Sequence, residues 1–116
     1  MAGKEEFMFK KLALVLLLGI FAIGAVVAWD GYVDITNKTG YTIYYIYVSH
    51  HTSSGWEDDM LGSEVLANGD TIRITLTGYS DSIFDIKCVD EDDDSYTFWG
   101  VNCATDDVTV TLSDLD

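Results

Sequence analysis

The sequence has no proline, two cysteines and only six lysine and arginine residues among its 116. Against these six bases stand 20 aspartate and glutamate residues, which give a formal net charge of −14. This imbalance excludes a nucleic-acid partner, because phosphate binding requires a basic face, and it disfavours an anionic membrane surface. The length suits a single domain, and a hydrophobic fraction of 48% is too high for a disordered acidic tail.

Familiar catalytic motifs are also absent. The chain contains no G-x-S-x-G, no H-E-x-x-H, no P-loop and no G-x-G-x-x-G pattern. Pairs of carboxylates are unavoidable in so acidic a chain, so they do not indicate a glycosidase. The sequence therefore favours a protein that is not an enzyme.

Residues 1–28 have the pattern of a signal peptide and predict an N-terminal signal helix. Three lysines precede an uncharged apolar run that ends at Ala28, and small residues near that end predict cleavage before Trp29. An uncleaved membrane anchor is the alternative, although the run is shorter than the roughly 20 residues of a spanning helix. Cleavage would leave residues 29–116 secreted or periplasmic, without membrane contact, and with a net charge of 3 − 18 = −15.

The rest of the chain predicts an all-β fold, an antiparallel, immunoglobulin-like β-sandwich of six to seven short strands. Apolar and polar residues alternate with a period of two, and turn residues separate the segments. The run at 41–49 is apolar and aromatic on both faces, which predicts a central strand. Asn68-Gly69 predicts a hairpin. Strands are expected at 32–37, 41–49, 71–77, 83–89, 95–101 and 108–113, with 61–66 as a further short strand or a turn.

Two long segments carry a resemblance to a known group of sequences. They read NKTGYTIYYIYVSHHTSSGWEDDMLGSEVL and FDIKCVDEDDDSYTFWGV. This pattern resembles a family of small secreted bacterial domains of uncharacterised function. The resemblance implies an exported β-sandwich and no particular chemistry. Members often have Asp-Gly-Asp in the acidic turn, where this chain has Asp93 in place of glycine, which questions a tight glycine-dependent turn.

The acidic turn at 90–94 is a candidate calcium site. Asp90, Asp92 and Asp94 have the spacing that opens a calcium-binding loop, and calcium prefers several hard oxygen ligands. The remainder of an EF-hand loop is missing, since Ser95 replaces the glycine at its sixth position and Val101 the glutamate at its twelfth. A solvated hairpin tip is the alternative reading.

The loop after the strand at 41–49 is a candidate binding surface. Trp56, Glu57, Asp58 and Asp59 follow one another in it, and an exposed tryptophan is a frequent binding hot spot. Alternatively, Trp56 folds back as an apolar plug.

The tyrosines of the strand at 41–49 and the two adjacent histidines can each be interpreted as a binding site or as ordinary parts of the fold. The four tyrosines in the strand before this loop could offer a platform for glycan or protein, or simply pack across strands. His50 and His51 are adjacent, so on a strand they would face opposite sides, and a single metal ion would rarely use both.

Cys88 and Cys103 are compatible with a disulfide or with two buried free thiols. Export favours a disulfide. In a hairpin closed at 91–94, however, position 88 faces about 97 and position 103 faces about 82. That offset is roughly 20 Å along a strand, whereas bridged Cα atoms lie within about 7 Å.

Together these features predict an exported, acidic, non-enzymatic β-sandwich that acts as a binding module. The strong negative field favours a partner with a basic protein surface. The sequence does not identify the partner, which could be a protein or a glycan. The alternative is a calcium-stabilised structural or adhesion domain that uses the acidic turn at 90–94. No cofactor other than calcium is expected.

Overall fold

The computed structural model describes residues 28–116, and the predicted signal segment lies outside this part of the chain except for Ala28. The described part is all-β, as predicted, with one short 3₁₀ helix. None of its helices has the length and apolar character needed to cross a membrane. The strands are β2 (Trp29–Lys38), β3 (Ile43–His50), β4 (Thr71–Tyr79), β5 (Ile83–Asp90), β6 (Ser95–Asn102) and β7 (Val108–Thr111), followed by the 3₁₀ helix η1 (Leu112–Asp114).

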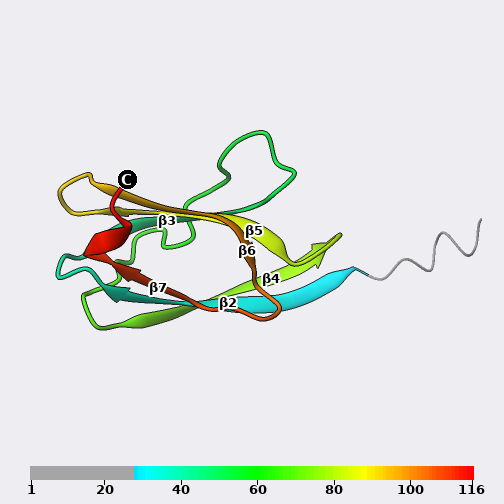
Figure 1. The fold of residues 1–116 in the computed structure, drawn as a ribbon, viewed down its shortest axis with the longest axis horizontal. Coiled ribbons are helices and arrows are strands. Elements are labelled where there is room, and N and C mark those ends of the chain that lie inside the picture. The colour runs from blue at the N-terminus through cyan, green and yellow to red at the C-terminus, as the bar shows by residue number, and fades with distance from the viewer. Residues whose placement is uncertain (1–27) are drawn as a thin grey trace, which may run out of the picture.

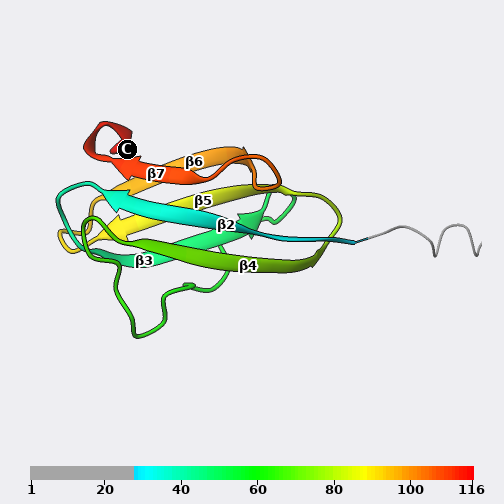
Figure 2. The same cartoon turned by 90° about the horizontal axis from the view of Figure 1, so that it is seen from below.

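The strands form two three-stranded sheets, one in the order β4-β2-β7 and the other in the order β3-β5-β6. The sheets lie as two layers in Figure 1, and Figure 2 looks onto the β4-β2-β7 layer. Strands β2 and β4 pair antiparallel, but β2 and β7 pair parallel. The expectation of a purely antiparallel fold is therefore wrong. The connection from β6 to β7 crosses between the layers, so no hairpin forces β7 to run against its neighbour.

Alternation along the strands places one set of side chains between the layers. Phe84, Ile86 and Cys88 on β5 are fully buried, and Ile74 and Leu76 on β4 are nearly so. The alternation of apolar residues in 71–77 and 83–89 predicts these inward positions. Ile72, which belongs to the same predicted face, is only half-buried. Burial of each such aliphatic or aromatic side chain contributes about 1.5–3 kcal/mol, so the two inner faces supply the main stabilisation.

The hairpin of β5 and β6 forms where the sequence predicts it, but it contains a bulge that was not predicted. Cys88 pairs with Tyr96, one position from the expected partner. The register shifts between Phe84 and Ile86, where Gly100 adopts a positive φ of 63°. The additional residue returns Val101 to the core side and leaves Trp99 on the outer face.

Strand β3 is an edge strand, so the prediction that it is central is wrong. Its free edge is covered by the loop that follows it. The backbone N–H of Met60 donates to the carbonyl of Ile46 at 2.7 Å, and Leu66 forms an antiparallel bridge with Ile43. The apolar pattern of 41–49 indicates a strand that is covered on more than one side, and this loop provides the additional cover. It also protects a strand edge that could otherwise pair with another chain.

The Asn68-Gly69 turn does not close a hairpin, contrary to the prediction. Leu66 pairs with β3 in one sheet, whereas β4 begins at Thr71 in the other. The turn instead carries the chain from layer to layer. Gly69, at a φ of 95°, donates its backbone N–H to the carbonyl of Asn37 on β2.

Both cysteines are free and buried, which contradicts the disulfide candidate and agrees with the alternative of two free thiols. The expected offset accounts for this result. Cys88 pairs with Tyr96, while the backbone N–H of Cys103 donates to the carbonyl of Ser82 near the other end of the hairpin. Burial raises the pKa of the Cys88 thiol to about 12. Burial, followed by the charges of Asp106 and Asp107, raises that of Cys103 to about 11.

Thiol titration of non-reduced protein tests this arrangement. At pH 8 the native protein should react with a disulfide reagent at neither cysteine, because buried thiols with raised pKa values hold almost no thiolate. After denaturation two thiols per chain should titrate. Denatured protein that gives no thiols until a reductant is added would contradict the arrangement.

Candidate functional site

Four aromatic side chains form a continuous row on the outer face of the β3-β5-β6 sheet. Tyr45 and Tyr47 stack with ring centroids 6.4 Å apart, and Tyr47 lies 6.5 Å from Trp56. Trp56 in turn lies 5.7 Å from Trp99. The row, hereafter the aromatic row, thus joins β3, the loop after β3 and β6. Trp99 is 71% exposed, the highest value among the exposed large hydrophobic residues of the described part of the chain.

A groove of about 260 Å³ lies beside the two tryptophans at the end of this row. Ser49 and Asp85 contribute to it from β3 and β5, and Ser53 contributes from the loop. Asp85 Oδ1 accepts the backbone N–H of Gly100 at 2.8 Å, which ties the groove to the bulge in β6. The groove therefore combines aromatic faces, hydroxyl groups and a carboxylate that is held in place.

Sequence reasoning located Trp56 but missed Trp99. In the structure Trp56 is half-buried between Tyr47 and Trp99, so it is neither an isolated exposed ring nor a core plug. The signal for Trp99 was Gly100, because a glycine inside a strand pattern suggests a bulge that can redirect its neighbours.

The acids next to Trp56 have different roles. Asp59 accepts hydrogen bonds from the backbone N–H groups of Ile46, Leu61 and Gly62, so it fastens the loop to the edge of β3. Glu57 and Asp58 are exposed. Of the three predicted binding acids, Glu57 and Asp58 are therefore the more accessible to a partner.

The acidic turn is organised around one buried carboxylate. Asp90 is 3% exposed. Its Oδ1 accepts the backbone N–H groups of Asp92 and Asp94 at 2.9 and 3.0 Å, and its Oδ2 accepts the hydroxyl of Tyr96 at 2.7 Å. Asp93 has a φ of 70°, so an aspartate occupies the left-handed position for which glycine is usual, and the tight turn forms without glycine.

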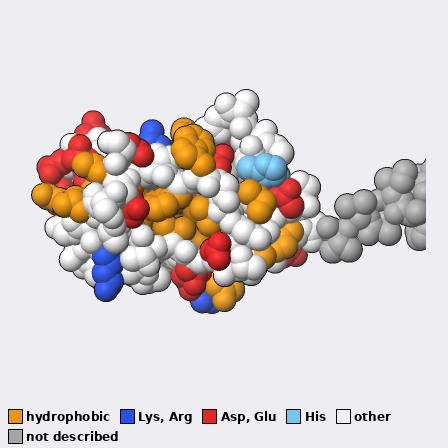
Figure 3. Space-filling view, in the orientation of Figure 1, with side chains coloured by type: hydrophobic (Ala, Val, Ile, Leu, Met, Phe, Trp, Pro, Cys, Tyr) orange, Lys and Arg blue, Asp and Glu red, His pale blue; other side chains and the backbone are white. Residues whose placement is uncertain are grey.

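Burial and the hydrogen bond to Asp90 raise the pKa of Tyr96 above its usual range, so the phenol remains a donor. Asp92 and Asp94 are exposed. Acidic side chains gather at the end of the molecule where this turn lies (Figure 3). The calcium site stays a prediction, and both oxygens of Asp90 are already engaged inside the hairpin.

Tyr96→Phe tests the role of this buried carboxylate. The substitution leaves Asp90 Oδ2 without its donor in a buried position, which should lower the free energy of unfolding by about 1–3 kcal/mol. Tyr44→Phe is the matched control, since Tyr44 is exposed and its loss of a hydroxyl should change stability by less than about 0.5 kcal/mol. Urea unfolding measures both, and equal effects would contradict the assigned role.

A melting experiment with calcium tests the predicted ion site. Chelator-treated protein should melt at the same temperature with and without millimolar calcium, because the hydrogen bonds to Asp90 already hold the turn without an ion. A rise in melting temperature that disappears in Asp92→Asn and Asp94→Asn would instead support the calcium-stabilised alternative.

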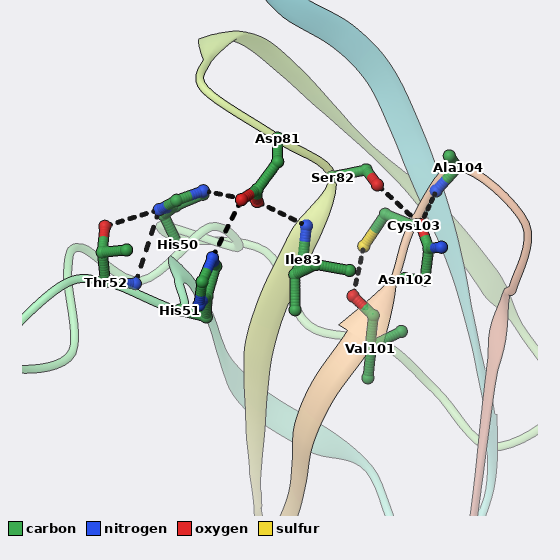
Figure 4. Close-up of polar contacts among 10 residues, drawn as sticks. All are labelled: His50, His51, Thr52, Asp81, Ser82, Ile83, Val101, Asn102, Cys103 and Ala104. Carbon is green, nitrogen blue, oxygen red and sulfur yellow. Dashed lines mark hydrogen bonds and ion pairs between the residues drawn. The ribbon is translucent and has the colours of Figure 1, made fainter.

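His50 and His51 do not face opposite sides, contrary to the expectation. His50 is the last residue of β3 and His51 lies in the following turn, so the alternation of the strand stops between them. Both rings contact Asp81, a residue that the sequence reasoning did not select (Figure 4). The pairing of β3 with β5 was the missing information, because it brings the turn before Ile83 opposite His51.

Comparisons with family models, with curated proteins and with solved structures each give no match for this chain. The resemblance to small secreted bacterial domains therefore stays a prediction.

Proposed function

We propose that this protein is an exported, non-enzymatic binding module that captures a basic protein surface at the aromatic row and its groove. The observation that carries the proposal is the assembly of Trp56 and Trp99 beside Asp85, from three separate parts of the chain. An immunoglobulin-like arrangement of the two layers and a secreted or periplasmic location belong to the same proposal.

The chemistry of the groove favours a cationic side chain. The face of an exposed tryptophan attracts lysine and arginine, and the attraction increases when the pair is partly desolvated. Asp85 lies in the groove, and Glu57 and Asp58 lie in the adjoining loop segment. The net charge of −15 for residues 29–116 steers a basic partner towards the protein over longer distances.

The groove also contains serine hydroxyl groups, which with a stacked tryptophan could bind a neutral sugar. Binding of a neutral sugar would not use the net negative charge of the protein. The basic partner is therefore the reading that uses both the aromatic and the charged features of the site, and a neutral glycan is the outcome that the experiment must separate from it.

Titration with a hexa-arginine peptide, followed by tryptophan fluorescence and calorimetry, tests the proposal. Trp99→Ala should weaken binding about tenfold or more, which corresponds to about 1.4 kcal/mol. Tyr32→Ala is the control, because it removes an exposed ring from the other sheet and should change the affinity less than twofold. Added salt should weaken binding as charges are screened.

Two outcomes would overturn the proposal. Equal binding of the peptide by the parent protein and by Trp99→Ala would remove the groove from the binding site. Binding of a neutral glucose hexasaccharide, lost in Trp99→Ala and accompanied by no binding of the peptide, would replace the basic partner by a glycan.

A further inference from the structure

Three potential metal ligands converge at one point beyond the end of β3. His50 Nε2 lies 2.8 Å from Asp81 Oδ1, and His51 Nε2 lies 3.0 Å from Asp81 Oδ2. One ligand atom from each residue lies within 4.8 Å of the others. Figure 4 shows both rings directed at the one carboxylate, which comes from the turn before β5.

The ring of His50 is held firmly by its surroundings. It is 6% exposed, stacks on Tyr79 at 5.6 Å and meets Phe84 edge-on at 5.3 Å. Its Nδ1 lies 2.7 Å from the hydroxyl of Thr52. Histidines that bind metals usually have the second ring nitrogen hydrogen-bonded in this way, which fixes the ring and its tautomer.

The carboxylate of Asp81 is also held in place by hydrogen bonds. The backbone N–H of Ile83 donates to Oδ1 at 3.1 Å. The same carboxylate faces His50 with Oδ1 and His51 with Oδ2, so it is held between the two imidazoles by contacts on both of its oxygens.

All the imidazole nitrogens of the chain lie in this cluster. The sequence has two histidines in all, and both are in this cluster. Both cysteines are buried in the fold. For a divalent ion that prefers imidazole, the cluster is thus distinguished from the acids that are spread over the rest of the chain.

We propose that His50, His51 and Asp81 form a three-ligand site for a divalent late transition-metal ion, zinc in the first instance. The two Nε2 atoms and one carboxylate oxygen would supply three of four tetrahedral positions at about 2.0–2.2 Å, with the fourth left to water or to a ligand from a partner. Entry of the ion replaces the two imidazole–carboxylate hydrogen bonds. Each ring would then bind the ion through Nε2 and carry a proton on Nδ1. In His50 that proton would face the Thr52 hydroxyl at 2.7 Å and replace the longer 3.4 Å contact from the Thr52 backbone N–H.

Calorimetric titration of chelator-stripped protein with zinc chloride tests the site. We expect saturable binding of one zinc per chain and a melting temperature higher by at least about 10 °C at a free zinc concentration 100 times the dissociation constant. Calcium chloride, which prefers oxygen ligands, should give neither effect at this cluster.

The variants are chosen to keep the fold intact. His51→Gln alters a half-exposed ring and Asp81→Asn keeps an acceptor for Ile83, and each should weaken zinc binding at least about tenfold. Asp92→Asn, an exposed aspartate in the distant acidic turn, is the matched control and should leave zinc affinity within twofold. Unchanged affinity in both cluster variants would overturn the proposal.

Nitrogen-15 NMR of the imidazoles provides a readout that a purely structural role would not move. Zinc should shift both rings to the tautomer protonated at Nδ1. If zinc produces neither heat nor a change of tautomer, the cluster is only a hydrogen-bond network that stabilises the fold, and the metal site is rejected.

Discussion

The turns and strand ends of this protein depend on hydrogen bonds from backbone N–H groups to side-chain oxygens. A chain without proline or a disulfide in the described part must fix its loops by other means, and short acidic side chains can accept the N–H groups that the strands leave free. Nine of the 18 acids in residues 28–116 accept at least one such hydrogen bond. They are Asp30, Asp59, Asp81, Asp85, Asp90, Glu91, Asp107, Asp114 and Asp116.

This use of carboxylates changes the meaning of the net charge. The composition of the acidic turn at 90–94 suggests an ion site, yet its first residue, Asp90, accepts three hydrogen bonds from within the hairpin. Asp59 likewise holds the loop against β3 rather than presenting a charge to a partner. All 18 acids contribute to the long-range negative field. Glu57 and Asp58 are exposed and accept none of these backbone hydrogen bonds, so their carboxylates are open to direct contact.

Local pattern was enough to predict what depends on neighbours in sequence. The all-β class, the inward faces of β4 and β5, and the hairpin register to within one residue all follow from alternation and turn composition. What alternation cannot show is which strands meet. The edge position of β3 and the parallel pairing of β7 are decided by how the layers are connected.

The same distinction explains which residues of the candidate sites could be selected from the sequence. Trp56 was visible because it stands alone in a polar loop, whereas Trp99 needed a bulge at Gly100 to reach the outer face. The histidine pair was visible as a pair, but its partner Asp81 lies about 30 residues away. Only the pairing of β3 with β5 brings them together.

The two proposed sites share the loop at 51–59, which raises the question of whether they are coupled. Coupling requires that a ligand at one site removes freedom that the other site would otherwise have to remove. The loop is already fastened at its start by His51 to Asp81 and at its end by Asp59 to Ile46. Between these points Glu57 accepts a hydrogen bond from Ser53 and donates its backbone N–H to Ser49.

A zinc ion would therefore replace an existing anchor rather than create one. Little freedom of the loop remains for the ion to remove. Binding of the ion should therefore improve the affinity for a second ligand at Trp56 only slightly. We accordingly infer a coupling free energy below the roughly 1–3 kcal/mol typical of allosteric proteins. The geometry that positions the three metal ligands in advance is thus the same geometry that keeps the aromatic row independent of them.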